Sequence, residues 1–483
     1  MIENLPYFFS TDNGIYFYDN STNIILPITK EEKEFLSKLR LHTSITDYKI
    51  DKDNEYIIHF IKKYSLFQKR SEVTNGEITS EFVHNYIREN GISHMCLIVT
   101  DQCNFRCKYC IYSDHYFYSK NYTDTNMSLD VALKAIDYYF KVNQTAIQYN
   151  PQLIPSIGFY GGEPLLNWEV IVASVEHAKK YDANTYFSIT TNGYLLDQNK
   201  IQFMLDNNFS ISISLDGDKE SNDRNRVNCN NQGTFDVVYK NILLLQEAVD
   251  KRPDKKIKNA MVNILITQDN LTDLEKIYDF FHDNPNILDH ITNVNSVNNS
   301  NTDYYDCQCS SEILSRRNEQ VKKLLKLYKE NLYDKFLRSF FSDIVSVVDL
   351  VTPFSNNGLL GCCIPGAHKL TVATDGNYHA CEKINQNYPI GNVESGLNFD
   401  VITKCLNTIL ELRRKHCNGC NLLNLCGLCL AHFETDSNLK FNENHCRDIK
   451  EAMNTTLKIC YSIKEAKDEK RAKEVKENEL YQS

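Results

Sequence analysis

The stretch Thr100-Asp-Gln-Cys103-Asn-Phe-Arg-Cys107-Lys-Tyr-Cys110 places three cysteines in one short loop. It directly follows an apolar run, residues 95–100, whose length and composition predict a β-strand. Three thiolates at this C-x3-C-x2-C spacing can hold three irons of a cubane cluster and leave the fourth iron without a protein ligand. A structural zinc site would need another ligand nearby, and Lys108, Ile111 and Tyr112 cannot supply it. The loop therefore predicts an iron–sulfur cluster with one open iron.

Strands and helices alternate from this loop onward and predict an α/β fold. The six strands in βα order indicate a parallel sheet covered by helices, either a doubly wound sheet or a partial barrel. In both architectures the functional sites lie at the carboxyl ends of the strands. After the first strand, further strands are expected at 156–160, 186–191, 209–215, 260–267 and 290–297, with helices near 168–180, 198–206, 235–248 and 271–282.

The regions on either side of this series predict separate modules. Residues 1–90 contain short alternating strands and two helical stretches but no cysteine, which is typical of a small α+β, winged-helix-like unit suited to recognition. Residues 301–360 are expected to form a helical bridge. Residues 361–450 form a cysteine-rich domain with a hairpin signal at Asp375-Gly376. Residues 451–483 predict a charged C-terminal helix or tail.

Composition excludes several classes of function. The chain has 53 basic and 63 acidic residues, a net charge of −10, so it offers no basic field for nucleic acid. No apolar run approaches the roughly 18 residues of a membrane helix, and no signal peptide is recognisable, which predicts a cytoplasmic protein without a membrane partner. Nine of the 17 cysteines fall between Cys362 and Cys446. In a reducing compartment such spacing favours metal ligands over disulfides.

The cysteine loop, placed after the first strand of a βα series, resembles the signature of the radical S-adenosylmethionine (SAM) superfamily. Further motifs follow the next strands: 158–164 matches the family's GGE segment, and 190–193 and 212–217 resemble its turns beside the SAM ribose. The resemblance implies a partial (β/α)6 barrel over 91–300, a catalytic [4Fe–4S] cluster on Cys103, Cys107 and Cys110, and SAM as cofactor. Taken singly, the motif residues would be ordinary turn or surface residues. The SAM contacts it implies are Tyr109, Gly161, Gly162, Glu163 (for the amino group), Asn192, Ser214, Asp216 and Arg226 (for the carboxylate).

The second cysteine region resembles the SPASM extension of radical SAM enzymes, which binds two auxiliary [4Fe–4S] clusters. Its last pair, Cys426-x2-Cys429, is one residue shorter than the family's usual C-x3-C. The fourth ligand of the inner cluster stays open between Cys362, Cys307, Cys309 and a substrate thiolate. Zinc knuckles are the alternative, although they usually have a gap of roughly 15–20 residues between cysteine pairs. The resemblance implies Cys363, Cys381 and Cys429 for the inner cluster, and Cys417, Cys420, Cys426 and Cys446 for the outer one.

The resemblance also implies chemistry on a peptide. A 5′-deoxyadenosyl radical would abstract hydrogen from a ribosomally made, cysteine-rich precursor peptide, and a cysteine sulfur would then join a carbon as a thioether. Residues 1–90 would recognise the precursor, and an electron donor such as flavodoxin or ferredoxin would be a partner. The alternatives are an anaerobic sulfatase-maturing (formylglycine-generating) enzyme, another SPASM peptide-modifying enzyme, or a non-catalytic iron–sulfur electron carrier.

Overall fold

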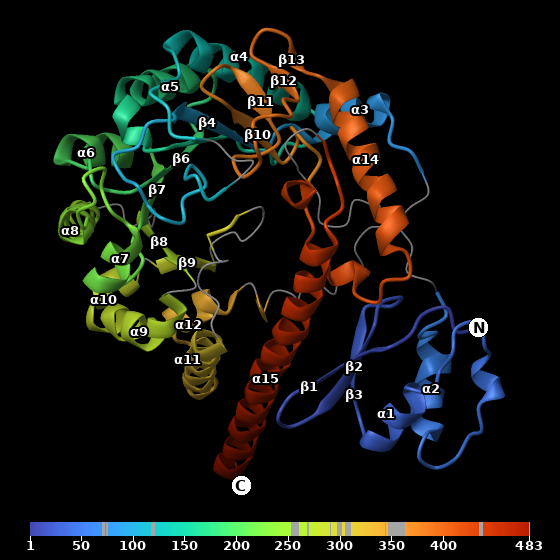
Figure 1. Ribbon diagram of the computed structural model, residues 1–483. Helices are drawn as coiled ribbons and strands as arrows, with labels where there is room; N and C mark the ends of the chain where they lie inside the picture. Colours follow the sequence, from blue (N-terminus) through green and yellow to red (C-terminus); the bar gives the residue numbers. More distant parts are fainter. Residues whose placement is uncertain are drawn as a thin grey trace.

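The structure is a computed structural model in which one large, curved sheet carries helices on its outer face (Figure 1). Its sheet has ten strands in the order β13-β12-β11-β10-β4-β5-β6-β7-β8-β9. The described residues are 1–69, 73, 76–116, 121–252, 260–267, 270–289, 291–296, 302–304, 311–342, 344–345, 363–433 and 438–482.

Six consecutive parallel strands confirm the α/β fold that the sequence predicts. They alternate with helices because apolar residues recur at strand spacing in one set of segments and at helical spacing in the other. The strands are β4 (His94–Thr100), β5 (Ser156–Gly161), β6 (Tyr186–Thr191), β7 (Phe209–Ser214), β8 (Ala260–Ile266) and β9 (Ile291–Ser296). The helices are α4 (Leu129–Ala146), α5 (Trp168–Tyr181), α6 (Gln198–Asp206), α7 (Lys219–Asn225), α8 (Phe235–Asp250), α9 (Leu274–Asp283) and α10 (Pro285–Leu288).

The two faces of this sheet differ in chemistry. Leu97, Phe159, Phe187 and Ile211 belong to the main hydrophobic core, which lies between the sheet and its helices. Successive side chains of a strand point to opposite faces. The other face therefore carries the alternate positions, and on β7 these are all serines: Ser210, Ser212 and Ser214. A polar inner face is suited to a binding site rather than to a second core.

The C-terminal region joins the barrel at its first strand. The predicted hairpin is present as β10 (Lys369–Val372) and β11 (Asn377–His379). Strand β10 also pairs in parallel with β4, so that Lys369 lies opposite His94 and Thr371 opposite Cys96. Cys381, two residues after β11, is thereby brought to the barrel. The short strands β12 (Gly391–Asn392) and β13 (Gly396–Leu397) complete this side of the sheet.

The N-terminal module has its own three-stranded sheet and its own core. That core extends to Phe67. Helix α3 (Ser80–Asn90), which the sequence assigned to a 1–90 module, packs instead on α4 and on α14 (Phe399–Cys417), with Val83 and Ile87 in the main core. The module consists of β1 (Tyr7–Ser10), β2 (Ile15–Asp19), β3 (Ile24–Ile28), α1 (Lys30–Leu36) and α2 (Glu55–Tyr64).

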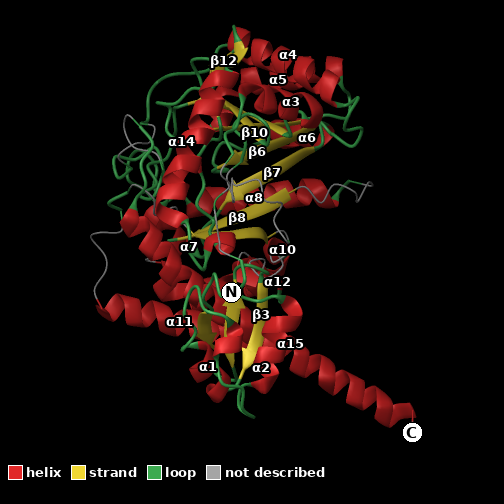
Figure 2. Cartoon of the chain, turned by 90° about the vertical axis from the view of Figure 1, so that its right-hand side faces the viewer, coloured by secondary structure: helices red, strands yellow, loops and turns green. Residues whose placement is uncertain are grey.

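A 40-residue helix, α15 (Glu443–Gln482), links the cysteine-rich domain to the N-terminal module. It begins earlier than the predicted terminal helix, so Cys446 lies in its first turn. Leu457 and Tyr461 of α15 pack against Phe9 and Tyr16 of the N-terminal sheet. Figure 2 shows the last turns of α15 extending beyond the rest of the molecule. Helices α11 (Ser311–Glu330) and α12 (Lys335–Phe340) form the described part of the predicted bridge.

Within the described part of the chain, no helix is both long enough and apolar enough to cross a membrane.

Candidate functional site

The three-cysteine loop lies at the carboxyl end of β4 and is fixed by backbone hydrogen bonds. The Arg106 N–H donates to the Val227 carbonyl at 2.7 Å, and the Cys229 N–H donates to the Asn104 carbonyl at 3.1 Å. The Lys108 N–H also donates to the Asn225 carbonyl at 3.1 Å. The loop is therefore held against the segment that follows α7, which carries Arg226.

The three thiols of this loop are close enough to influence one another's ionisation. Burial raises the pKa of Cys103 and Cys110 and raises that of Cys107 to about 12, and neighbouring thiols raise the pKa of Cys103 and Cys107 further. Thiolates in such a place need a compensating positive charge, which irons would supply. Among the described residues, no three His, Cys, Asp or Glu side chains are placed to bind a single metal ion. A cubane cluster would place each of the three cysteines on a different iron.

The glycine pair at the end of β5 is required by contact with the cysteine loop. Gly161 has φ +143°, and a Cβ there would lie 2.2 Å from the Thr100 carbonyl oxygen. A Cβ on Gly162 would lie 2.1 Å from the Gln102 carbonyl oxygen. The Gly162 N–H donates to the Thr100 carbonyl at 2.9 Å. Glycine is therefore needed at both positions because a side chain would separate the two backbones. This reason differs from the contact with SAM that the sequence motif predicts.

Glu163 connects the ends of β5 and β6 from a fully buried position. Its carboxylate accepts hydrogen bonds from the Thr191 hydroxyl at 2.7 Å, the Asn192 N–H at 2.8 Å and the Leu165 N–H at 3.0 Å. Burial raises the pKa of Glu163 to about 7, although these hydrogen bonds oppose the shift. Its contact with the SAM amino group stays a prediction.

Asn192 lies between β6 and the cysteine loop. Its amide nitrogen donates to Asn104 Oδ1 at 2.8 Å and lies 4.0 Å from Cys103 Sγ. Its amide oxygen accepts a hydrogen bond from the Tyr194 N–H at 3.0 Å. Asn192 is therefore oriented beside the cysteine loop, and its contact with SAM stays a prediction.

Tyr109, Asp216 and Arg226 form a buried polar group beneath the cysteine loop. The Tyr109 hydroxyl donates to Asp216 Oδ2 at 2.5 Å, and Arg226 Nε lies 3.0 Å from Asp216 Oδ1. The Arg226 guanidinium also lies over the Tyr109 ring, 5.4 Å from its centroid. Burial opposes the charge of Arg226, but the Asp216 carboxylate raises the Arg226 pKa overall. Ser214, at the end of β7, is half-buried.

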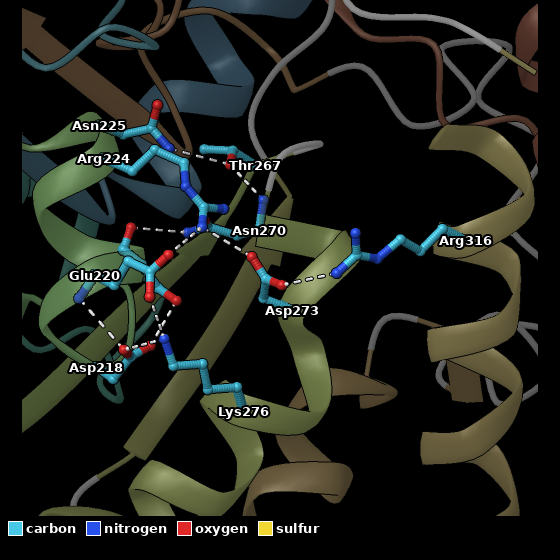
Figure 3. A network of polar contacts seen from close by, with 10 residues as sticks. Asp218, Glu220, Arg224, Asn225, Thr267, Asn270, Asp273, Lys276 and Arg316 are labelled. Atoms are coloured by element: carbon cyan, nitrogen blue, oxygen red, sulfur yellow. Dashed lines mark hydrogen bonds and ion pairs between the residues drawn. The ribbon is translucent and has the colours of Figure 1, made fainter. Parts of the chain in front are cut away.

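An ionic network fixes α7, the helix directly before Arg226, to α9 and α11 (Figure 3). This network was not predicted from the sequence. Arg224 pairs with Asp273 at 2.8 Å, and Arg316 of α11 lies 3.5 Å from the same carboxylate. Lys276 of α9 pairs with Asp218 at 3.0 Å and with Glu220 at 2.6 Å. The only sequence signal is the charge alternation within α7. The network positions the segment that holds the cysteine loop.

A second charged pair, which was not predicted from the sequence, includes Glu382, the residue directly after Cys381. The Lys369 ammonium contacts both oxygens of Glu382, at 3.0 and 2.9 Å. Burial opposes ionisation of Glu382, yet the Lys369 charge keeps the Glu382 pKa below its usual value. Tyr160 lies in the same region. Burial raises the pKa of Tyr160, and the charges of Glu382 and Cys110 raise it further. The signal for this pair in the sequence is an acidic residue, Glu382, directly after the predicted cluster ligand Cys381.

The C-terminal cysteines gather in two groups. In the inner group, the pKa of Cys381 is raised by burial, by Glu382 and by Cys429, and Cys363 likewise acts on Cys429. Cys362, Cys307 and Cys309 lie outside the described residues. The binding of auxiliary clusters by these two groups stays a prediction. The outer group lines one cavity of about 30 Å³, whose cysteines are Cys417, Cys420, Cys426 and Cys446 and whose other walls include Leu422, Leu423, Leu428 and Met453.

Comparison with known proteins agrees with this geometry. The sequence model of the radical SAM superfamily matches residues 97–281. A cysteine-type anaerobic sulfatase-maturating enzyme of Clostridium novyi is 24% identical over 340 residues, covering 68% of this chain and 84% of that protein. The radical SAM cyclopropyl synthase TigE of Paramaledivibacter caminithermalis is 26% identical over 453 residues, covering 88% of this chain and 86% of TigE.

A solved structure shares the fold. It is native anSMEcpe with bound AdoMet, which aligns with a TM-score of 0.55 at 20% identity and covers 78% of this chain and 99% of that one. The cysteine loop, the motifs at successive strand ends and the matched sequence model lead to one conclusion: residues 97–281 of this chain form a radical SAM domain.

Proposed function

We propose that this chain is a SPASM-type radical SAM enzyme that modifies a peptide. The observation that carries the proposal is the three-cysteine loop at the carboxyl end of β4, surrounded by the buried polar residues of the next three strand ends. The two further cysteine groups support the SPASM part. Relatives named as sulfatase-maturating enzymes support a peptide or protein as the substrate.

The described residues fit the cofactors that this class requires. Cys103, Cys107 and Cys110 would hold the [4Fe–4S] cluster, which together with SAM supplies a 5′-deoxyadenosyl radical able to take a hydrogen atom from carbon. The two C-terminal groups would hold auxiliary clusters that accept the electron left after bond formation. Tyr109, Asn192 and Arg226 would orient SAM beside the loop.

We propose that Glu382 accepts the proton of the reaction. Thioether formation removes one hydrogen atom from a substrate carbon. It then removes one proton from the cysteine thiol and one electron as the sulfur bonds to the carbon radical. Glu382 directly follows Cys381, and the Lys369 ammonium contacts both of its carboxylate oxygens. A deprotonated carboxylate can accept a proton from a thiol.

We propose the cysteine thioether as the bond formed. A second candidate is a carbon–carbon ring, since the relative named cyclopropyl synthase aligns over 88% of this chain. The third is formylglycine formation, since the relative named sulfatase-maturating aligns over 68%.

Mass spectrometry of a cysteine-rich precursor peptide, produced anaerobically with the enzyme, separates these products. A thioether removes two hydrogens and one iodoacetamide-reactive thiol, whereas a cyclopropane removes two hydrogens and leaves every thiol reactive. Formylglycine reacts with a hydrazine probe. An unmodified peptide in the presence of active SAM cleavage would refute peptide modification of that precursor.

Cofactor content tests the cluster assignment separately. Reconstituted protein should hold about 12 irons, from roughly three four-iron clusters. Replacing Cys103, Cys107 and Cys110 with Ala should remove about four irons and abolish 5′-deoxyadenosine formation, measured by chromatography. Near four irons with bound zinc would overturn the SPASM assignment.

A further inference from the structure

A buried arginine lies on the helix that leads into the outer cysteine group. Arg413 of α14 is 1% exposed and is one of the largest fully buried side chains in the part of the chain that the structure describes. The other buried residues of α14 are Ile402, Leu406, Ile409, Leu410 and Cys417. A guanidinium keeps its proton in proteins, so Arg413 brings a permanent positive charge into this interior. The proposed thioether chemistry does not use this charge.

Both the helix and the following loop place Arg413 at the outer group. Arg413 and Cys417 are four residues apart on α14, so their side chains lie on the same face of the helix. Arg413 Nη2 donates a hydrogen bond to the carbonyl of Leu428, two residues after Cys426. The guanidinium also lies 5.7 Å from the centroid of the Phe433 ring, whose face attracts a cation. Since Cys417 and Leu428 both line the four-cysteine cavity, the guanidinium is held directly behind the wall of that cavity.

The charge of Arg413 acts on the thiols of the outer group. Burial raises the pKa of Cys417 to about 12 and also raises the pKa of Cys426. In both thiols the Arg413 charge opposes the effect of burial, which means that it favours the thiolate. Metal ligation requires the thiolate. Because water screens charges weakly in such an interior, the Arg413 charge also acts on a metal group bound to these sulfurs.

A nearby cation affects the two oxidation states of an iron–sulfur cluster differently. A four-iron cluster bound by four thiolates carries a net negative charge, and one-electron reduction adds a further negative charge. A buried cation beside the cluster therefore stabilises the reduced form more than the oxidised form, which raises the reduction potential. Net charge, hydrogen bonds to the sulfurs and solvent exposure are the protein properties that tune these potentials.

The inner group has the opposite surroundings. Burial raises the pKa of Cys381 to about 12, and the Glu382 carboxylate raises it further. The Lys369 charge opposes this shift and acts less strongly than Glu382. A carboxylate beside the inner group disfavours added negative charge there, whereas Arg413 favours added negative charge at the outer group.

We propose that Arg413 raises the reduction potential of the cluster held by the outer cysteine group. This inference rests on the proposed function, which assigns a cluster to that group. Thioether formation releases one electron, and the charge of Arg413 makes the outer group the more favourable place for that electron. Arg413 is therefore a positioning residue for charge, acting through the cluster and not on the peptide.

A redox titration of the reconstituted holoenzyme, followed by electron paramagnetic resonance, tests the proposal. Arg413→Gln removes the charge and keeps an amide donor for the Leu428 carbonyl. At a fixed potential it should lower the ratio of reduced to oxidised outer cluster at least tenfold, which is about 59 mV for a one-electron couple. Arg413→Met, which fills the buried site with an apolar chain, should give the same change and serves if the Gln variant does not fold. The signal lost in a Cys420→Ser, Cys446→Ser double variant identifies the outer cluster.

Three variants separate the charge from packing and from net charge. Arg413→Lys retains the charge, and Phe433→Leu disturbs the same buried contact without a change of charge. Lys415→Gln removes a positive charge from the exposed face of α14. Each of the three should change the ratio less than threefold. A loss in Arg413→Lys or Phe433→Leu as large as that in Arg413→Gln would overturn the role of the charge.

The same titration distinguishes failure of this inference from failure of the proposed function. An unchanged ratio in both Arg413→Gln and Arg413→Met, with the outer cluster present, would overturn the role of Arg413 and leave the SPASM assignment standing. Wild-type protein with zinc in the outer group, and no signal that depends on Cys420 and Cys446, would overturn both.

Discussion

At the scale of single residues, the edge of the radical SAM site depends on residues that hold the cysteine loop and the neighbouring turns in place before any cofactor binds. Glu163 accepts hydrogen bonds from two backbone N–H groups and one hydroxyl, and Gly162 lets the turn touch the loop backbone. The family motif that predicts these positions attributes them to SAM contact. In this chain the same residues also hold the protein part of the site in place. Their removal should therefore affect stability as well as catalysis.

Replacement of Glu163 by Gln should cost more stability in acid than in base. The unfolded-state pKa is near 4.5 and the folded-state pKa is about 7, so the folded protein retains the proton as the pH rises between them. Retention of the Glu163 proton stabilises the folded protein. This stabilisation is fully present below pH 4.5 and is lost as the pH rises through 7, which lowers the free energy of unfolding by about 3 kcal/mol.

Urea unfolding of the wild type and Glu163→Gln at pH 5 and pH 8 measures this difference. Gln removes the titration and leaves a buried N–H unpaired, which costs about 1–3 kcal/mol at either pH. The destabilisation by Gln should be larger at pH 5 by about 2–3 kcal/mol. Equal destabilisation at the two pH values would contradict the assigned ionisation of Glu163.

Replacement of Gly162 by Ala should destabilise the protein, whereas the same change at Gly427 should not. A Cβ on Gly162 meets the Gln102 carbonyl at 2.1 Å, and a Cβ on Gly427 meets nothing within 4 Å. We expect a loss of about 2–3 kcal/mol for the first and below about 0.5 kcal/mol for the second. Thermal unfolding of the cluster-free variants compares them, and similar melting temperatures would contradict the close contact.

At the scale of elements, α7 matters because the segment after it carries both Arg226 and the backbone partners of the cysteine loop. Apolar periodicity predicts the surrounding strands and helices within a few residues, since each buries one face in the same core. It cannot predict the network at Arg224, because ionic partners on α9 and α11 are defined only after folding. The Lys369–Glu382 pair escaped prediction for the same reason.

Replacement of Arg224 by Met should loosen α7 and weaken SAM binding several-fold. The Arg224–Asp273 pair is mostly buried, so its loss should cost about 1–2 kcal/mol. The matched change Lys276→Met removes the half-exposed pairs with Asp218 and Glu220 and should cost about 0.5–1 kcal/mol. Urea unfolding and calorimetric titration with SAM test both variants. Equal SAM affinity in Arg224→Met and the wild type would show that the network does not position the site.

At the scale of the whole molecule, helix α15 and the hydrogen bonds of Asn424 connect the N-terminal module to the cysteine-rich domain. The division into a barrel and a cysteine-rich region is visible in the sequence because cysteines are absent before residue 96 and dense after residue 361. The attachment of β10 to β4 is not visible, because pairing between strands so distant in sequence leaves no periodic signal.

Deletion of residues 1–69 should weaken binding of the precursor peptide at least tenfold while SAM cleavage without peptide persists. The deleted part has its own core, and the barrel core does not include it. Truncation after Arg471 removes the far end of α15 and serves as the control, for which peptide affinity should not change. Fluorescence anisotropy of labelled peptide and chromatographic detection of 5′-deoxyadenosine measure the two properties. Unchanged affinity after the deletion would refute the recognition role.

The parallel pairing of β4 with β10 also sets a schedule for synthesis of the chain. Lys369, the partner of His94, is translated 369 − 94 = 275 residues later. At roughly 5–20 residues per second, the free edge of β4 waits about 14–55 s on the ribosome for its partner. Throughout that interval the cysteine loop is already made while the sheet beside it is still open. The C-terminal hairpin therefore completes this side of the sheet only after all six parallel strands have been translated.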